Sequence, residues 1–269
     1  MIEDNNLKKS VSAWLEEQGY PLEMRVASIL KKEGFRVIQS EYFSDPETGD
    51  SRELDIVAYA QKQIGEVLIR VSLIIECKRS VDKPWLLFKS KESRLANPAR
   101  VVQRATNTLG SIYLRELCQN EEVQKLSLFS LAENPAYGVT QALTSGKDIC
   151  YSALTSVSKA ARATVLKQEN YYNRPVKLCS IVFPVVAVSG RLFEVFLDKN
   201  TNVVVEEIEN GTLLWRNSIV GAPHTIINLV AEPNFEHFSA KMLPSINKFF
   251  ELSEKKFSQI LKDASTKVS

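Results

Sequence analysis

The sequence LIIECKRS, residues 73–80, places three aliphatic side chains directly before a glutamate, a cysteine, a lysine and an arginine. Such an apolar run is typical of a buried strand, and buried strands exclude charged side chains unless the charges have partners. Side chains alternate between the two faces of a strand, so Glu76 and Lys78 share one face and Cys77 lies on the other. The stretch therefore predicts that Glu76 and Lys78 act on the same space, while Cys77 packs in the core.

A second acid stands in the strand predicted for residues 52–60, where three apolar residues follow Asp55. If this strand forms a hairpin with the next one, and the turn is centred between Gly65 and Glu66, Asp55 faces Glu76 directly or on a diagonal. Two carboxylates at that separation repel each other unless a positive charge lies between them. The pair therefore predicts a cation-binding site.

The residue types at this site favour Mg²⁺ or Mn²⁺. Carboxylate oxygens suit a hard cation that keeps water in its remaining positions. A zinc site is not expected, because the chain has only two histidines and its four cysteines form no CxxC pair. A bound ion of this kind polarises a phosphoryl oxygen and acidifies a water. We therefore expect Asp55 and Glu76 to be metal ligands, and Lys78 to orient the attacking water or to stabilise the developing charge.

Glu23 is a third candidate acid. In the helix predicted for residues 22–33, it is aligned with Val26, Ala27 and Leu30 on the stripe that should face the sheet. A carboxylate on that stripe requires a partner, and a metal ion or its bound water is one candidate. The alternative is an acid at the start of a helix that favours the helix dipole and turns towards solvent.

Structural ion pairs are the alternative for the two strand acids. Glu76 would then pair with Lys78 or Arg79, and Asp55 with Arg52. The apolar residues around both acids argue against this alternative, because a buried ion pair loses more on desolvation than it gains unless its geometry is ideal.

Taken in order, these residues resemble the PD-(D/E)xK nuclease superfamily, and within it the Mrr-like branch of restriction-endonuclease-like enzymes. Glu23 matches the acid on the first helix, Asp55 the acid of the second strand, and Glu76-Cys77-Lys78 the (D/E)xK motif, while Leu54 stands where the motif name has proline. The resemblance implies an α-β-β-β-α-β core, a mixed sheet flanked by helices, from residue 22 to about residue 188. An insertion, C-terminal antiparallel strands and a last helix would elaborate it.

The same branch commonly carries a glutamine on the later helix. Gln141 or Gln103 would match it, and the position of the helix predicted for residues 139–167 favours Gln141. The resemblance therefore adds Gln141 to the catalytic residues Glu23, Asp55, Glu76 and Lys78.

Hydrophobic periodicity and turn signals predict the individual elements. In chain order we expect helices at 6–17 and 22–33, strands at 35–43, 52–60 and 66–78, an insertion at 81–138 with a helix at 98–117, a helix at 139–167, strands at 176–188, 192–197, 203–208, 213–215 and 225–230, and a helix at 235–261. The second and third strands are expected to be linked at 61–65, and Ser189-Gly190 is expected to form a hairpin turn. No repeat or low-complexity linker divides the chain, which favours one elaborated domain over 1–269, with its core at about 6–80 and 139–197 and an extension at about 198–269.

Residues 76–104 form a basic stretch beside the candidate site. Eight basic residues stand there against three acidic ones, a net charge of +5 that leaves −3 for the rest of the chain. Phosphate contact and a solvated charged loop both account for this charge. The residues expected to contact nucleic acid are Arg79, Lys83, Lys89, Lys91 and Arg94.

The sequence therefore predicts a Mg²⁺-dependent deoxyribonuclease acting in restriction, host defence or DNA repair. The alternative is a module that binds nucleic acid, or serves as a scaffold, on the same fold without catalysis. The 269 residues show no apolar membrane span and no apolar leader, and the scattered cysteines favour reduced thiols, so we expect a cytoplasmic protein with DNA as partner. A homo-oligomer is compatible with the sequence.

Overall fold

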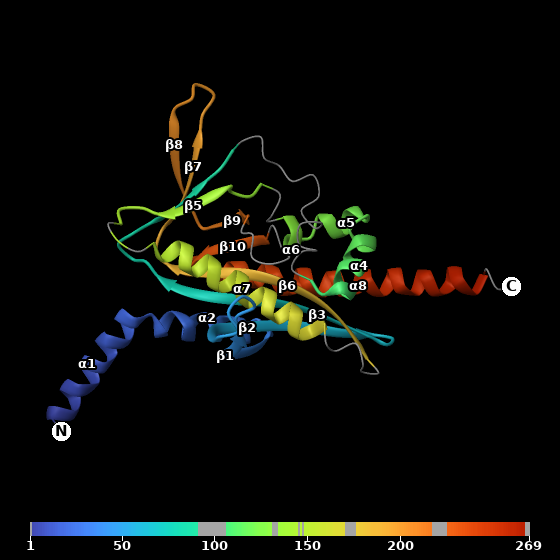
Figure 1. Ribbon diagram of the computed structural model, residues 1–269, viewed down its shortest axis with the longest axis horizontal. Helices are drawn as coiled ribbons and strands as arrows, with labels where there is room; N and C mark the ends of the chain where they lie inside the picture. Colours follow the sequence, from blue (N-terminus) through green and yellow to red (C-terminus); the bar gives the residue numbers. More distant parts are fainter. Residues whose placement is uncertain are drawn as a thin grey trace.

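The computed structural model describes residues 2–90, 106–130, 134–144, 146, 148–169, 176–216 and 225–266. Within these residues the chain forms a mixed α/β fold, in which helices flank a six-stranded sheet and a smaller four-stranded sheet adjoins it (Figure 1). The predicted α/β class is therefore confirmed.

The N-terminal half begins with two helices and an antiparallel meander, and further helices and strands follow them. Its elements are α1 (Ile2–Gln18), α2 (Tyr20–Lys32), β1 (Arg36–Ser44), β2 (Ser51–Ile64), β3 (Val67–Arg79), β4 (Trp85–Phe88), α4 (Thr108–Leu117), α5 (Glu121–Gln124), α6 (Ser127–Ser130) and β5 (Gly138–Gln141). Gly19 separates the first two helices with a φ of +87°, and Gly34 ends the second with a φ of +99°. The two predicted helices and the three-strand meander are confirmed.

The C-terminal half returns the chain to the sheet. Its elements are α7 (Ile149–Glu169), β6 (Lys177–Ser189), β7 (Leu192–Leu197), β8 (Val203–Ile208), β9 (Asn210–Trp215), β10 (Thr225–Ala231), η3 (Glu232–Asn234) and α8 (Phe235–Thr266). The large sheet has the order β1-β2-β3-β6-β10-β9, and the small one the order β5-β4-β7-β8. In the large sheet β6 runs parallel to β3 and β10 parallel to β6, so the sheet is mixed.

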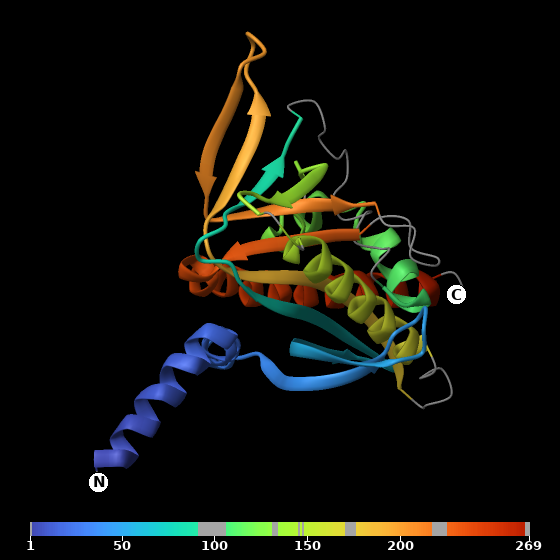
Figure 2. The same ribbon diagram turned by 60° about the vertical axis from the view of Figure 1, so that its left-hand side comes forward.

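Helices cover both faces of the large sheet. On one face α2, α4, α6 and α8 form an apolar layer with the strands, and on the other α7 does so together with β4 and β9. Figure 2 shows α7 and α8 on opposite sides of the sheet, and α1 projecting away from it. The central strand β3 is consequently buried on both faces over most of its length. No helix in the described part of the chain is both long and apolar enough to span a membrane.

The hairpin of β2 and β3 has the predicted register. Its turn consists of Gly65 and Glu66, with Gly65 at a φ of +58°. Pairing runs from Ile64 opposite Val67 to Ile56 opposite Ile75, which is the register that aligns Asp55 with Glu76. The link predicted for residues 61–65 was too long, because residues 61–64 pair with residues 67–70 and continue the strand.

The edge strand β1 is kinked in its middle. Ser40 has a φ of +53°, in the left-handed region that non-glycine residues seldom adopt. Pairing with β2 holds at Gln39 and at Glu41, on either side of the kink. The residue of β2 that lies between the partners of these two is Asp55.

Three of the predicted elements are wrong in extent. The helix expected at 139–167 is a strand, β5, followed by α7, because residues 138–141 pair with β4, and Asp148 caps a new helix by accepting the N–H of Cys150 at 2.8 Å. Of the helix expected at 98–117, residues 98–105 lie outside the described residues, and α4 begins only at residue 108, where the side chain of Asn107 caps it by accepting the N–H of Gly110 at 2.9 Å. The last helix continues to residue 266.

The hairpin expected at Ser189-Gly190 is also wrong. After β6 the chain leaves the large sheet, and β7 pairs with β4 and β8 in the small one. A Cβ added to Gly190 would lie 2.4 Å from the carbonyl oxygen of Ser80, so the main chain that follows β6 passes close to the main chain that follows β3. Packing against residue 80, rather than a hairpin turn, accounts for this glycine.

Candidate active site

The candidate site lies where β2 and β3 separate. The last paired residues of the hairpin are Ile56 and Ile75. One residue further, Oδ2 of Asp55 accepts the main-chain N–H of Cys77 at 2.6 Å. The carboxylate of Asp55 thereby takes the place of a main-chain acceptor and is fixed beside Glu76. We call Asp55, Glu76, Lys78 and Glu23 the carboxylate site.

Glu76 lies on the face of β3 that α7 covers. It is only 6% exposed, and both of its carboxylate oxygens have partners. Lys78 Nζ donates to Oε1 at 2.5 Å, and the hydroxyl of Ser156 on α7 donates to Oε2 at 2.9 Å. Glu76 and Lys78 therefore share one face, as the alternation of the strand predicts.

Cys77 points to the opposite face. It is buried in the apolar layer that contains α2 and α8. Burial, together with the negative charges of Asp55 and Glu23, raises the pKa of this thiol well above its ordinary value of 9.0. Cys77 is thus packed in the core on the face opposite Glu76, as the alternation of the strand predicts.

Asp55 carries a charge that its surroundings disfavour. Burial and the neighbouring charge of Glu76 raise its pKa from an ordinary 3.8 to about 7, and the N–H of Cys77 and the charge of Lys78 offset only part of this rise. The ion pair with Arg52, weighed as an alternative, is absent, because Arg52 Nε lies 2.6 Å from Asp45 instead. In the described residues no cation lies within ion-pair distance of Asp55.

Glu23 completes the group from the other side of the sheet. It is half-buried on α2, whose buried face is made of Leu22, Val26, Ala27 and Leu30. Burial and the charges of Glu53 and Glu76 raise its pKa, whereas Lys78 lowers it. The helix therefore brings Glu23 within electrostatic range of Glu76 and Lys78, and the described residues offer it no hydrogen-bond partner.

The oxygen atoms of the site fit a hard cation with few protein ligands. In the described residues Asp55 lacks a counter-ion and Glu76 has only one, and no imidazole or thiolate hydrogen-bonds to either carboxylate. Searching the described residues finds no group of three or more His, Cys, Asp or Glu side chains arranged around one metal position. Two carboxylates with water in the other positions match the way Mg²⁺ is bound by proteins.

Gln141 does not lie on a helix and does not contact the carboxylates. It is 5% exposed on β5, where its Nε2 donates to the hydroxyl of Ser80 at 2.8 Å. Trp85 Nε1 donates to the same hydroxyl at 3.1 Å, and the hydroxyl donates to the carbonyl of Lys83 at 2.6 Å. The placement on a helix was wrong because β5 precedes α7, and the contacts of Gln141 tie β4 and β5 to the loop after β3. Gln103 lies outside the described residues.

Ser156 and Lys159 are the polar residues of α7 that the sequence did not single out. Ser156 reaches Glu76, and Lys159 is buried with its ammonium 2.9 Å from Asp45 and 2.7 Å from Glu47. Both residues stand beside buried apolar residues such as Ala153 and Val157, but Ser158 and Gln168 are buried on the same helix too, so a polar residue in α7 does not by itself indicate a site.

Three of the five predicted basic residues lie in the part of the chain that the structure describes. Arg79 and Lys83 are exposed at the end of β3 and in the loop that follows. Lys89 is ion-paired with Glu194 on β7, so its charge is already compensated. Lys91 and Arg94 lie outside the described residues. Two of the five residues, Arg79 and Lys83, are therefore exposed cations within five residues of Lys78 in the sequence.

Comparison with known protein families, with curated proteins and with solved structures finds no match.

Proposed function

We propose that the protein is a metal-dependent nuclease that hydrolyses phosphodiester bonds in DNA. The observation that carries the proposal is Asp55, whose carboxylate is fixed on the N–H of Cys77 beside Glu76 without a counter-ion in the described residues. An ionised carboxylate in this position opposes folding, and an asparagine would accept the same hydrogen bond without that cost. A bound cation would offset this cost, because it would compensate the negative charge of Asp55.

The element order supports the same proposal. α2, β1, β2, β3, α7 and β6 follow one another in the α-β-β-β-α-β order that the PD-(D/E)xK resemblance implies, with β4 to β5 inserted between β3 and α7. Asp55 and Glu76-x-Lys78 stand on adjacent strands of that core, and Glu23 stands on its first helix. We therefore propose a restriction-endonuclease-like core.

In this proposal Asp55 and Glu76 hold Mg²⁺ or Mn²⁺. When bound, the ion would supply Lewis-acid polarisation of a phosphate oxygen and an acidified water. Burial lowers the pKa of Lys78, but the charges of Glu76 and Asp55 raise it, and the net result lies above the ordinary value. Lys78 therefore keeps a positive charge beside Glu76 at neutral pH. That charge stabilises negative charge developing on the phosphate. Glu23, without a hydrogen-bond partner in the described residues, is the group available to accept a proton from water.

The test is cleavage of plasmid and single-stranded DNA in Mg²⁺ or Mn²⁺ by the wild type, Asp55→Asn and Lys78→Gln. We expect the wild type to cleave, a chelator to abolish cleavage, and each variant to lose at least about 100-fold in rate. Lys62→Gln is the matched control, because Lys62 is on the same hairpin but pairs with Glu254 on α8. Circular dichroism checks that each variant folds. Equal residual cleavage by the wild type and both site variants contradicts the proposal.

A second candidate function is a nucleic-acid-binding module without catalysis. Both oxygens of Glu76 already have partners within the chain, which also suits a structural role for that residue. Such a module binds DNA with steep salt dependence and cleaves it with neither metal. Thermal unfolding separates the two, because a metal site raises the midpoint in Mg²⁺ for the wild type and much less for Asp55→Asn.

A further inference from the structure

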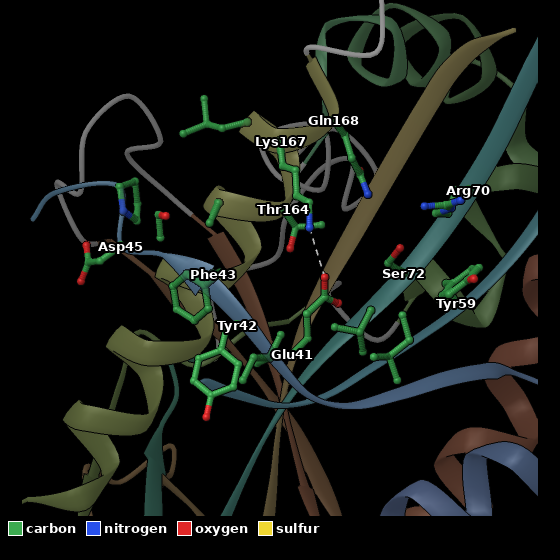
Figure 3. A pocket seen from close by; sticks show the side chains of 17 residues that line it. Glu41, Tyr42, Phe43, Asp45, Tyr59, Arg70, Ser72, Thr164, Lys167 and Gln168 are labelled. Carbon is green, nitrogen blue, oxygen red and sulfur yellow. Dashed lines mark hydrogen bonds and ion pairs between the residues drawn. The ribbon is translucent and has the colours of Figure 1, made fainter. Parts of the chain in front are cut away.

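A second site is suggested by a cavity of about 560 Å³ between the C-terminal half of α7 and strands β1, β2 and β3 (Figure 3). Its size falls within the range of roughly 300–1,000 Å³ that is typical of small-molecule sites. It lies on the same face of β3 as Glu76, but Ser72 is four residues away from Glu76 along the strand, roughly 13 Å, and the fully buried Ile74 stands between them. The cavity is therefore separate from the carboxylate site.

One part of the cavity wall is apolar. Phe43 from β1 and Leu54, Val57 and Tyr59 from β2 line it. These side chains offer a surface for an aliphatic or aromatic group and no strong hydrogen-bonding group except the hydroxyl of the tyrosine.

Gln168 supplies an acceptor that lacks a partner. The residue is only 8% exposed and lines the cavity, and its Oε1 has no hydrogen-bond partner in the part of the chain that the structure describes. A buried carbonyl in this state costs free energy, and nearly all buried acceptors in proteins are satisfied. In Figure 3 the side chain of Gln168 extends from α7 with its amide nitrogen towards the end of the cavity that holds Arg70 and Ser72, and a 180° rotation of the amide exchanges this nitrogen with Oε1. A ligand with a hydroxyl or N–H group would satisfy it.

Arg70 supplies an uncompensated positive charge. Its Nε donates to Oε1 of Gln61 at 2.9 Å, and its guanidinium lies 4.7 Å from the centre of the Tyr59 ring, so both contacts hold it in place. No acid of the described residues pairs with Arg70, although thirteen other ion pairs are found there. Ser72, two residues along on the same face, adds a hydroxyl.

The two acids that line the cavity are already neutralised. Glu41 pairs with Lys167 of α7 at 3.3 Å, the dashed line in Figure 3, and Asp45 pairs with Lys159 at 2.9 Å. Arg70 is therefore the charge left for a ligand, and one guanidinium balances one negative charge. A carboxylate matches the planar fork of an arginine and carries that single charge.

We propose that this cavity binds a small organic acid. Its carboxylate lies on Arg70 and Ser72, a hydroxyl or N–H group next to the carboxylate donates to Gln168, and an apolar body about the size of a phenyl ring packs on the apolar wall. The inference rests on no assumption about nuclease activity.

Isothermal titration with three matched probes tests the proposal. 3-Phenyllactate has all three features, 3-phenylpropionate lacks the hydroxyl, and 3-phenyllactamide lacks the charge. A probe of this size reaches a dissociation constant of about 1 mM in a fitting pocket. We expect binding of 3-phenyllactate by the wild type, and affinity at least about tenfold lower for either other probe or for Arg70→Gln or Gln168→Leu. Arg191→Gln is the control that keeps the affinity, because Arg191 pairs with Glu207 in the small sheet and does not line the cavity.

A second readout distinguishes a ligand-binding role of Gln168 from a structural one. Replacing an unpartnered buried amide by leucine should raise the unfolding midpoint of the free protein and remove the further rise caused by 3-phenyllactate. A structural glutamine would instead lower the midpoint when replaced. The proposal is overturned if 3-phenyllactate fails to bind the wild type at up to about 10 mM, or if it binds Gln168→Leu and Arg70→Gln as tightly as the wild type.

Discussion

Two acid clusters on the α7 face of the sheet differ in how far the charge of their buried aspartate is compensated. The first, which we call the Lys159 cluster, contains Asp45, Glu47, Arg52 and Lys159. Asp45 is 1% exposed and accepts from Lys159 at 2.9 Å, with Arg52 at 2.6 Å. Although burial raises its pKa, the hydrogen bonds from Lys159 and from the N–H of Glu47, with the charge of Arg52, lower it to about 2.

The second cluster is the carboxylate site. Asp55 is less buried than Asp45, yet its pKa is raised to about 7, because burial and Glu76 outweigh a single N–H donor and the charge of Lys78. In each case the hydrogen-bond and charge partners of the aspartate, rather than its depth of burial, decide whether its pKa is raised or lowered. The fold therefore compensates the charge of Asp45 and leaves the charge of Asp55 without a counter-ion in the described residues.

The largest expected effect comes from breaking the compensated cluster. Asp45→Ala leaves Lys159, whose side chain is 8% exposed, with Glu47 as its remaining partner, and we expect a loss of about 3–5 kcal/mol in the free energy of unfolding. Because the pKa of Asp45 is lowered, the stability it contributes is present above its ordinary pKa of 3.8 and is lost as the pH falls towards 2. Urea denaturation at pH 7 measures the loss.

A surface pair provides the control for this variant. Glu41→Ala breaks the ion pair with Lys167, whose side chain is 68% exposed, and should cost less than about 1 kcal/mol. Equal losses for Asp45→Ala and Glu41→Ala would remove the distinction between the buried cluster and an ordinary surface pair.

Removing the charge of Asp55 should raise the free energy of unfolding rather than lower it. With its pKa raised to about 7, the protonated form stabilises the fold below the ordinary pKa of 3.8, and this stability is lost as the pH rises through about 7. Asp55→Asn avoids the loss. In the presence of a chelator, its free energy of unfolding should therefore exceed that of the wild type by about 2–4 kcal/mol at pH 8, with a smaller gain at pH 5. Urea denaturation at the two pH values measures it. A gain that does not change with pH would show that Asp55 is not the titrating group.

A smaller effect than those at Asp45 and Asp55 should come from the contact between α7 and the carboxylate site. Ser156→Ala deletes the hydroxyl that donates to Glu76 at 2.9 Å, and we expect a loss of about 1–2 kcal/mol, since the acceptor is a buried charge. Ser152→Ala is the matched control, because that hydroxyl donates only to the carbonyl of Ile149 within the same helix. Urea midpoints of the two variants should differ, and equal midpoints would mean that the bond to Glu76 adds nothing.

The parts of the site that lie on one hairpin could be predicted from the sequence. Strand alternation fixes the faces of Glu76, Cys77 and Lys78, and a two-residue turn at Gly65 and Glu66 fixes the register that places Asp55 opposite Glu76. These relations are local, so residue spacing alone determines them.

The parts that depend on distant contacts could not be predicted. Ser156 is 80 residues from Glu76, and a serine in a helix gives no local signal for that contact. Arg52 has Asp55 as a close neighbour in sequence, but it lies opposite Phe43 on β1, which brings it to Asp45 instead. Gln141 was placed on a helix because residues 139–141 were read together with α7, whereas pairing with β4 makes them a strand.

The kink at Ser40 has a consequence for the solubility of the protein. An edge strand is a template on which another chain can add a strand and start aggregation. Ser40, with its φ of +53°, divides the edge β1 into two stretches of four residues, 36–39 and 41–44, each shorter than the roughly five or six residues of a typical strand. The outer edge of the large sheet is thus poorly suited to joining a second chain, and a residue that straightened β1 at this position would expose a continuous nine-residue template.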